Sequence, residues 1–348
     1  MKKALKIVGI CILVIALLLA AALTIYYYRN MHWYDKYEAA LKKTGAIEQQ
    51  VTLPNGNVIN YGEVVNDKPA LLLIHGQMGE WESYAMTLGK LSEDWHVYAV
   101  DVYGHGESSH DESLYYIDVN GDDLIWFIDN VIAEPTVVAG HSNGALTAAY
   151  IGAYGGENVS GVVMEDPPVF STEEGEWENS FAYINTYKPL HEYNMSEKSE
   201  CYEAYSLRHG YFGDKYGGIP DLAEKYHKKH PGEVVKIGVL PSIAWSVHQY
   251  LPDYDLTYGE HFYDLSWNNG YTHRQILSDV HVPCIIIHEK ESIDANGVYL
   301  CATSDKNAKE AAALLGDYGR LEEVEASYHS FHSRHVDEYA DILKSLQK

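Results

Sequence analysis

The chain has 348 residues, of which 46% are hydrophobic, so it can bury a sizeable core and is not disordered as a whole. Its formal net charge of −25 would be repelled by phosphate backbones, so we expect no nucleic-acid partner. The length suits one large domain with an insertion, or two domains.

The first predicted element is a membrane-spanning helix within residues 1–29. Lysines at positions 2, 3 and 6 precede an uncharged apolar run over 7–25, and three tyrosines and an arginine follow it. Nineteen residues at 1.5 Å each span about 28 Å, close to a bilayer core. The lysines favour a cytoplasmic N-terminus and an extracytoplasmic bulk. The alternative is a signal peptide cleaved near Ala20-Ala21-Ala22, which would leave a secreted protein.

The following elements alternate between strands and helices. Residues 30–49 form a predicted stalk, and 51–64 alternates in polarity around Asn55-Gly56, which predicts a hairpin. Four apolar segments predict buried strands, and helix-length segments separate them: strands 70–76, 95–101, 135–140 and 160–166, helices 80–92, 118–132 and 143–154. Strands that are apolar on both faces and alternate with helices indicate a parallel sheet covered on both sides.

The alternation stops at Pro167-Pro168 and resumes about 105 residues later. The segment 167–275 is rich in aromatic, histidine and acidic residues without a strand period, and we expect a helical cap there. The sheet then returns, with strands over 282–289 and 319–327 and helices over 305–315 and 335–346. The predicted core is therefore split into 50–166 and 276–348.

A serine stands between two glycines where a predicted strand becomes a helix, in Gly140-His141-Ser142-Asn143-Gly144. A nucleophile on so tight a turn needs strained backbone angles and small residues two positions away on each side. The turn lifts the hydroxyl clear of the sheet and aims the N–H of Asn143 at an oxyanion. This arrangement predicts Ser142 as a nucleophile.

Four motifs, in this order, resemble the α/β-hydrolase superfamily: LLLIHGQMGEW (71–81), DVYGHGESS (101–109), GHSNG (140–144) and SYHSFH (327–332). They look like the family's oxyanion loop, its DxxGxGxS loop, its nucleophile elbow and its catalytic-histidine loop. The resemblance covers about 50–166 and 275–348. It implies an α/β fold with a mostly parallel sheet flanked by helices, and a variable cap at 167–275 that sets substrate choice.

The resemblance also implies roles for individual residues. Ser142 would attack an acyl carbonyl, and His329 would take its proton and return it to the leaving group. His332, three residues further on, is the second possibility for the base. Backbone N–H groups of Gln77 and Asn143 would hold the oxyanion. The side chain of His75 would brace its loop, and Asp101 would be structural.

The acid of the triad stays open between several carboxylates. The family's usual place follows the strand at 282–289, near Ser292, where Glu291 and Asp294 lie close by. Some members instead take the acid from the end of the preceding core strand, here Asp166. We rank Asp166 first, Asp294 second and Glu291 third.

The resemblance thus implies an extracytoplasmic serine hydrolase that cleaves a small-molecule or lipid-like acyl ester, thioester or amide through an acyl-enzyme. No zinc spacing and no glycine-rich phosphate loop occur, so we expect no metal and no cofactor. The alternative is a catalytically inactive hydrolase fold that serves as a binding module at the cell surface. Whether Cys201 pairs with Cys284 or Cys301 is left open.

Overall fold

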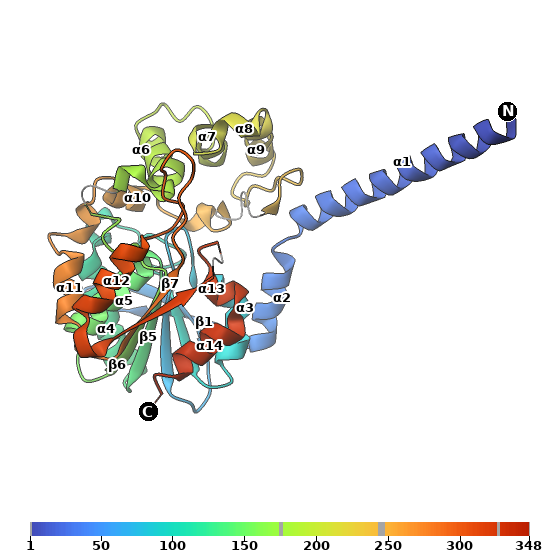
Figure 1. The fold of residues 1–348 in the computed structure, drawn as a ribbon. Coiled ribbons are helices and arrows are strands. Elements are labelled where there is room, and N and C mark those ends of the chain that lie inside the picture. The colour runs from blue at the N-terminus through green and yellow to red at the C-terminus, as the bar shows by residue number, and fades with distance from the viewer. Residues whose placement is uncertain (1, 174–176, 243–247, 326–327, 348) are drawn as a thin grey trace.

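The computed structural model describes residues 2–173, 177–242, 248–325 and 328–347. Within them, eight strands form one sheet in the order β1-β2-β4-β3-β5-β6-β7-β8 (Figure 1). Pairing is antiparallel from β1 to β4 and parallel from β4 to β8. The strands are β1 (Ile47–Thr52), β2 (Val58–Val64), β3 (Ala70–Ile74), β4 (His96–Val100), β5 (Thr136–His141), β6 (Val159–Glu165), β7 (Cys284–Glu289) and β8 (Gly319–Val324).

Helices cover both faces of this sheet, as the two-sided apolar strands predict (Figure 1). One face packs on α4 (Ile117–Phe127), α5 (Asn143–Tyr154), α11 (His273–Asp279) and α12 (Asp305–Leu314). The other packs on α3 (Ala85–Leu91), α13 (Phe331–Arg334) and α14 (Val336–Lys344), with α2 (Asp35–Thr44) beside them. Every residue of β3 and of β7 is buried, so the central strands carry the core. The predicted α/β class is confirmed.

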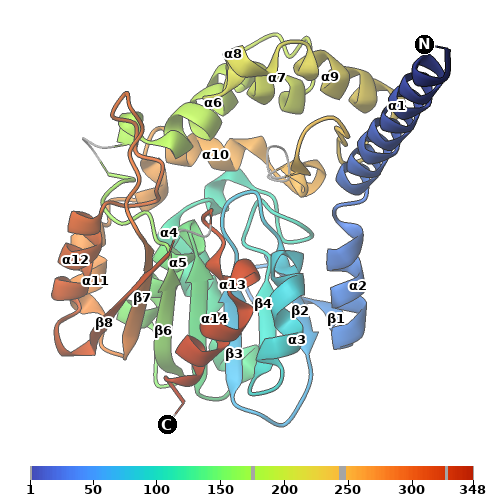
Figure 2. The same cartoon turned by 45° about the vertical axis from the view of Figure 1, so that its right-hand side comes forward.

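The chain between β6 and β7 forms a helical layer over the carboxyl ends of the strands (Figure 2). Its helices are α6 (Lys188–Asn194), α7 (Tyr202–His209), α8 (Gly213–Tyr216), α9 (Ile219–Lys229) and α10 (Leu256–Tyr263). The loop after β7 joins the same layer, because the N–H of Phe181 donates to the carbonyl of Tyr299 over 2.8 Å. The end of the predicted cap, at residue 275, falls inside α11, whose Ile276 and Leu277 belong to the main core.

The N-terminal helix α1 (Lys2–Met31) projects away from the rest of the molecule (Figure 1). It is long and apolar enough to cross a membrane, and its most apolar stretch is not buried against the protein, as in an anchor or a signal sequence. Its C-terminal end touches the cap, since the side-chain amide of Asn30 donates to the carbonyl of Gly238 over 3.1 Å.

Most element boundaries lie within a few residues of their predicted places. β1 begins at Ile47, inside the predicted stalk, because this edge strand is mostly exposed and lacks an apolar signal. The predicted helix 118–132 is α4 followed by a π-helical turn over Ile128–Ile132. Residues 326–327, at the end of the last predicted strand and the start of the histidine motif, lie outside the described residues.

Candidate active site

Ser142 occupies the turn between β5 and α5 with a φ of 55°, a conformation that side-chain-bearing residues rarely adopt. The two flanking glycines are required by close contacts. A Cβ atom on Gly140 would lie 2.0 Å from the carbonyl oxygen of Gly144, and one on Gly144 would lie 2.4 Å from that of His75. The turn therefore has the geometry that the glycine spacing predicts.

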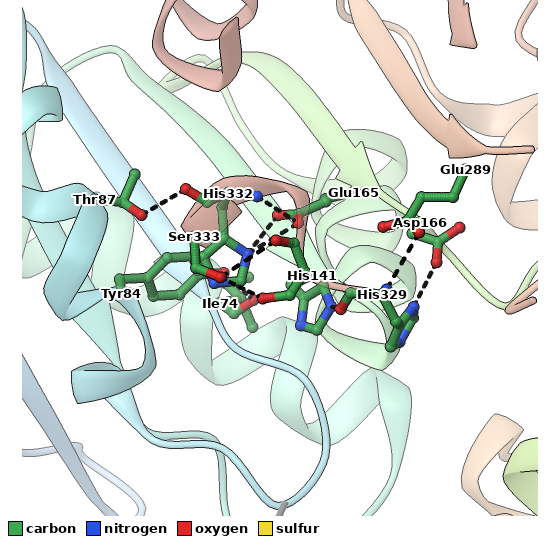
Figure 3. A network of polar contacts seen from close by, with 11 residues as sticks. Ile74, Tyr84, Thr87, His141, Glu165, Asp166, Glu289, His329, His332 and Ser333 are labelled. Atoms are coloured by element: carbon green, nitrogen blue, oxygen red, sulfur yellow. Dashed lines mark hydrogen bonds and ion pairs between the residues drawn. The ribbon is translucent and has the colours of Figure 1, made fainter. Parts of the chain in front are cut away.

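A carboxylate–histidine pair lies beside this turn. Asp166 follows β6 directly and is 2% exposed, and its Oδ2 atom hydrogen-bonds Nδ1 of His329, which follows β8 (Figure 3). The His329 ring is 41% exposed. Burial lowers the pKa of His329, but the Asp166 carboxylate outweighs this and raises the pKa above its usual value.

Backbone bonds hold these residues at adjacent strand ends. The N–H of Ser142 donates to the carbonyl of Glu165 over 2.9 Å, and that of Asp166 donates to Ile287 over 2.8 Å. The N–H of His329 donates to the Glu289 carboxylate over 3.2 Å. Like Ser142, both Asp166 and His329 have positive φ, at 42° and 60°. Backbone strain of this kind clusters at functional sites.

The other candidate acids lie elsewhere. The carboxylate of Asp294 accepts the hydroxyl of Tyr211 in the cap and the N–H of Val298 over 2.8 Å. The hydroxyl bond to Tyr211 lowers the pKa of Asp294. Glu291 caps the start of α12, where it accepts the N–H of Asp305 over 3.1 Å. The structure thus brings Asp166, and neither Asp294 nor Glu291, onto His329.

A second carboxylate–histidine pair lies beside the first, with His141 between the two (Figure 3). Glu165 is fully buried, and it accepts both the backbone N–H and Nδ1 of His332 at 2.9 Å. Burial raises the pKa of Glu165, but the charge and hydrogen bonds of His332 lower it to about 2. His332 is 3% exposed, so its ring belongs to the interior. Spacing predicts His332 only as a second possible base. The signal of two carboxylate–histidine pairs, which that prediction missed, is the consecutive Glu165-Asp166 together with the spacing His329-x-x-His332.

His141 connects the two pairs. Its Nε2 atom lies 2.8 Å from the carbonyl oxygen of His329, and its ring packs against those of His329 and His332 at centroid distances of 4.7 and 5.2 Å. Burial lowers its pKa to about 3, so the ring is neutral and can donate this bond from Nε2. The His329 loop is therefore held by the partly buried His141, whose ring packs in turn on the buried His332.

Gln77 and Asn143, the predicted oxyanion donors, lie at the ends of β3 and β5. Asn143 is the first residue of α5, where a backbone N–H has no partner within its own helix. Gly76 places the loop of Gln77 against the nucleophile turn, since a Cβ on Gly76 would lie 3.0 Å from Cβ of Ser142. Both side chains meet cap tyrosines. That of Gln77 hydrogen-bonds Tyr254 and Tyr187, and the Asn143 amide donates to Tyr258 over 3.0 Å.

The loop 101–109 packs against the oxyanion loop and holds it in place. The carboxylate of Asp101, 2% exposed, accepts the N–H of Trp81 over 2.7 Å and the amide of Asn60 over 2.8 Å. Gly106 has a φ of 51°, and a Cβ on it would lie 2.2 Å from Oδ2 of Asp101. His75 accepts the N–H of Val102 over 3.1 Å, and burial lowers its pKa to about 4. These contacts are structural.

A cavity of about 510 Å³ lies at the antiparallel side of the sheet, and none of the predicted catalytic residues lines it. Its walls carry five carboxylates, those of Glu48, Glu80, Asp101, Glu107 and Asp253. Burial and the neighbouring Asp101 raise the pKa of Glu80 to about 9. Walls of this kind suit neither an acyl chain nor an anionic substrate.

Comparison with known proteins bears on the fold that carries these residues. The model of the "Alpha/beta hydrolase family" matches residues 71–342. A Haemophilus influenzae protein, provisionally named an esterase/lipase, is 30% identical over 98 residues, which are 28% of this chain and 34% of that protein. The match thus spans about a third of that relative's length. A human serine hydrolase-like protein is 25% identical over 138 residues, 39% of this chain and 68% of the other.

Two solved structures share the fold. A membrane phospholipase A, described as a bacterial virulence factor, superposes with a TM-score of 0.58 at 18% identity and covers 96% of each chain. The enol-lactonase of Burkholderia xenovorans LB400 superposes with a TM-score of 0.57 at 16% identity, over 86% of this chain and 99% of that one. At these identities the likeness is one of fold.

Proposed function

The chain belongs to the α/β-hydrolase family, and on this premise we propose that it is a serine hydrolase that cleaves acyl esters, or related thioesters and amides, through an acyl-enzyme. The observation that carries the proposal is the contact between buried Asp166 and Nδ1 of His329 beside the turn that holds Ser142. The three side chains come from the ends of separate strands, and all three residues have positive φ. Strained residues brought together in this way are typical of a catalytic site.

The mechanism follows from which nitrogen of the His329 ring is already hydrogen-bonded. Asp166 holds Nδ1 of His329, so Nε2 is the ring atom left to take the proton of the Ser142 hydroxyl. The serine oxygen then attacks the acyl carbonyl, and the N–H groups of Gln77 and Asn143 hold the negative oxygen of the tetrahedral intermediate. His329 returns the proton to the leaving alkoxide. A water molecule then attacks the acyl-enzyme in the same way, with His329 as base, and the carboxylic acid product is released.

The proposed substrate is lipid-like, and the cap over 167–275 would select it. The buried cap residues Tyr187, Tyr254 and Tyr258 hydrogen-bond the side chains of Gln77 and Asn143, so the cap packs directly on the two predicted oxyanion residues. An acyl chain bound at Ser142 would therefore border aromatic side chains of the cap. The relative that is 30% identical over 98 residues is provisionally named an esterase/lipase, which agrees with this substrate class.

Ester hydrolysis by the full chain in detergent tests the proposal. We expect hydrolysis of p-nitrophenyl esters, with a preference along the series from acetyl to lauroyl that reports the length of the acyl site. A fluorophosphonate probe should label the chain once, at Ser142, because it traps an activated serine. A chain that hydrolyses no ester and takes no label would instead fit the inactive binding module.

The pH profile should report the raised pKa of His329. The base works only as neutral imidazole, so kcat/KM should be lost as the pH falls through a pKa above the usual 6.5. The measurement is kcat/KM for one ester between about pH 5 and 9. Asp166→Asn removes the charge that raises this pKa, so its residual activity should fall off at a lower pH. An acidic limb that stays in place would contradict Asp166 as the partner.

We further propose that α1 is retained as a single-pass anchor with its N-terminus in the cytoplasm and the hydrolase domain outside. The match to the membrane phospholipase A leaves about 4% of this chain uncovered, which is fewer residues than the 30 of α1. The match therefore includes part of α1. The protein should stay in membrane pellets after an alkaline carbonate wash, and added protease should reach the domain in intact cells. A soluble form that begins near residue 23 would show a cleaved signal peptide instead.

A further inference from the structure

A group of metal-ligating side chains lies in the cap, apart from the residues proposed for catalysis. Cys201 and Glu203 lie at the start of α7, and His227 lies near the end of α9. One potential ligand atom from each, the thiol sulfur, a carboxylate oxygen and a ring nitrogen, lies within 4.8 Å of the others. Figure 2 shows α7 and α9 in one row of cap helices, close to the end of α1.

The helices explain how residues so far apart converge. Cys201 is the N-cap residue of α7, and Glu203 follows within its first turn. On α9, Glu224 and His227 are three residues apart and so share one helix face. Glu224 accepts the backbone N–H of Cys201 over 2.7 Å, which joins the two helices at this point.

Two features make the cluster suited to a cation. A carboxylate oxygen of Glu203 lies within 4.8 Å of the Cys201 sulfur, and Glu224 accepts the backbone N–H of the same residue, so two carboxylates converge on Cys201. Lys228 pairs with Glu224 over 2.7 Å but is itself 70% exposed. The Nδ1 atom of His227 is buried and makes no hydrogen bond within the described residues; its nearest carboxylate oxygen, on Glu203, is 3.9 Å away.

We propose that Cys201, Glu203 and His227 bind a zinc ion, with Glu224 or a water molecule as the fourth ligand. Thiolate, imidazole and carboxylate together match the donor preferences of Zn²⁺, whereas a thiolate disfavours Ca²⁺ and Mg²⁺. In a tetrahedral zinc site the ligand atoms lie about 3.3–3.8 Å apart. The ligand atoms must therefore approach one another by at most about 1.5 Å, which side-chain rotation supplies.

Binding changes the proton count by one. The sulfur–zinc bond replaces the S–H bond of Cys201, and the thiol proton passes to solvent, while zinc takes carboxylate oxygen and imidazole nitrogen through their lone pairs. His227 is 42% exposed, so the ion can enter from solvent without opening the fold.

The location suggests a structural role. Cys201 belongs to a small cap core of seven buried residues that is separate from the two clusters on the sheet. Small cores of this kind commonly depend on a metal or a disulfide. Trp33, from the segment that follows α1, packs against the same core. Zinc would therefore fasten α7 to α9 at the place where the cap meets the chain leaving the apolar helix.

Metal binding by the full chain in detergent, stripped with a chelator and then dialysed, tests the proposal. We expect one Zn²⁺ per chain in competition with a chromophoric chelator, and a sulfur-to-cobalt charge-transfer band when Co²⁺ replaces Zn²⁺. Zinc at about 100 times its Kd should raise the unfolding midpoint by about 5 °C. None of these readouts depends on ester hydrolysis, so they stand or fall separately from the proposed enzyme activity.

Variants locate the ion. Cys201→Ser and His227→Gln should each lose at least tenfold in zinc affinity, and Cys201→Ser should lose the cobalt band. The matched controls, Cys301→Ser and His230→Gln, remove another free thiol and another histidine near the end of α9 and should bind like the wild type. If Cys201→Ser shows no cooperative unfolding, and so is not folded, the zinc affinity of His227→Gln tests the proposal instead, because His227 is partly exposed. A wild type without stoichiometric zinc, or His227→Gln with unchanged affinity, would overturn the proposal.

Discussion

Ser142→Ala is expected to lower kcat for ester hydrolysis by about 10⁴–10⁶-fold, the range seen when a triad nucleophile is removed. The reason is that the variant lacks the hydroxyl proposed as the nucleophile, which the turn between β5 and α5 carries. The oxyanion donors and substrate binding remain, so a residual rate above that of water should persist. The measurement is kcat for the best p-nitrophenyl ester, with loss of fluorophosphonate labelling as the second readout.

His329→Ala provides the internal comparison. Because serine and histidine act as one unit, the double variant with Ser142→Ala should be no slower than either single variant. A matched control is His335→Ala, which removes a nearby, partly exposed ring whose nearest carboxylate belongs to Glu338. If Ser142→Ala keeps more than a tenth of wild-type activity, the nucleophile is another residue and the proposed mechanism fails.

The second large effect is expected at the acid. Asp166→Asn should lower kcat by about 10⁴-fold, because an amide in this position leaves the histidine in the wrong tautomer and no longer stabilises the imidazolium. Asp166 is buried at the end of β6, and its Oδ2 atom contacts Nδ1 of His329. Steady-state kinetics with the same ester measures the effect, and the unfolding midpoint shows whether the variant is folded.

Asp294→Asn is the matched control for this variant. The same chemical change there alters only the contacts with Tyr211 and the neighbouring turn, so activity should stay within a fewfold of the wild type. The opposite pattern, a slow Asp294→Asn and an active Asp166→Asn, would assign the acid to the loop after β7. It would also require that loop to move toward His329 in the working enzyme.

Local sequence determined much of this protein. Two-sided apolar strands fixed the α/β class and the order of the elements, because only a sheet covered on both faces buries such strands. The glycines at positions 140 and 144 fixed the turn that carries Ser142, since a Cβ at either position would collide with backbone. Both signals are short-range: the residues that cause the structure are neighbours in the chain.

The tertiary structure decided what depends on residues far apart. Sequence spacing left Asp166, Asp294 and Glu291 open as the acid, and strand order, with β6 beside both β5 and β7, places Asp166 at His329, 163 residues away. The buried Glu165–His332 pair and the cap cluster around Cys201 likewise join segments with no common motif. Side-chain chemistry at such places is set by which strand ends and helix faces meet, and that is a property of packing rather than of local sequence.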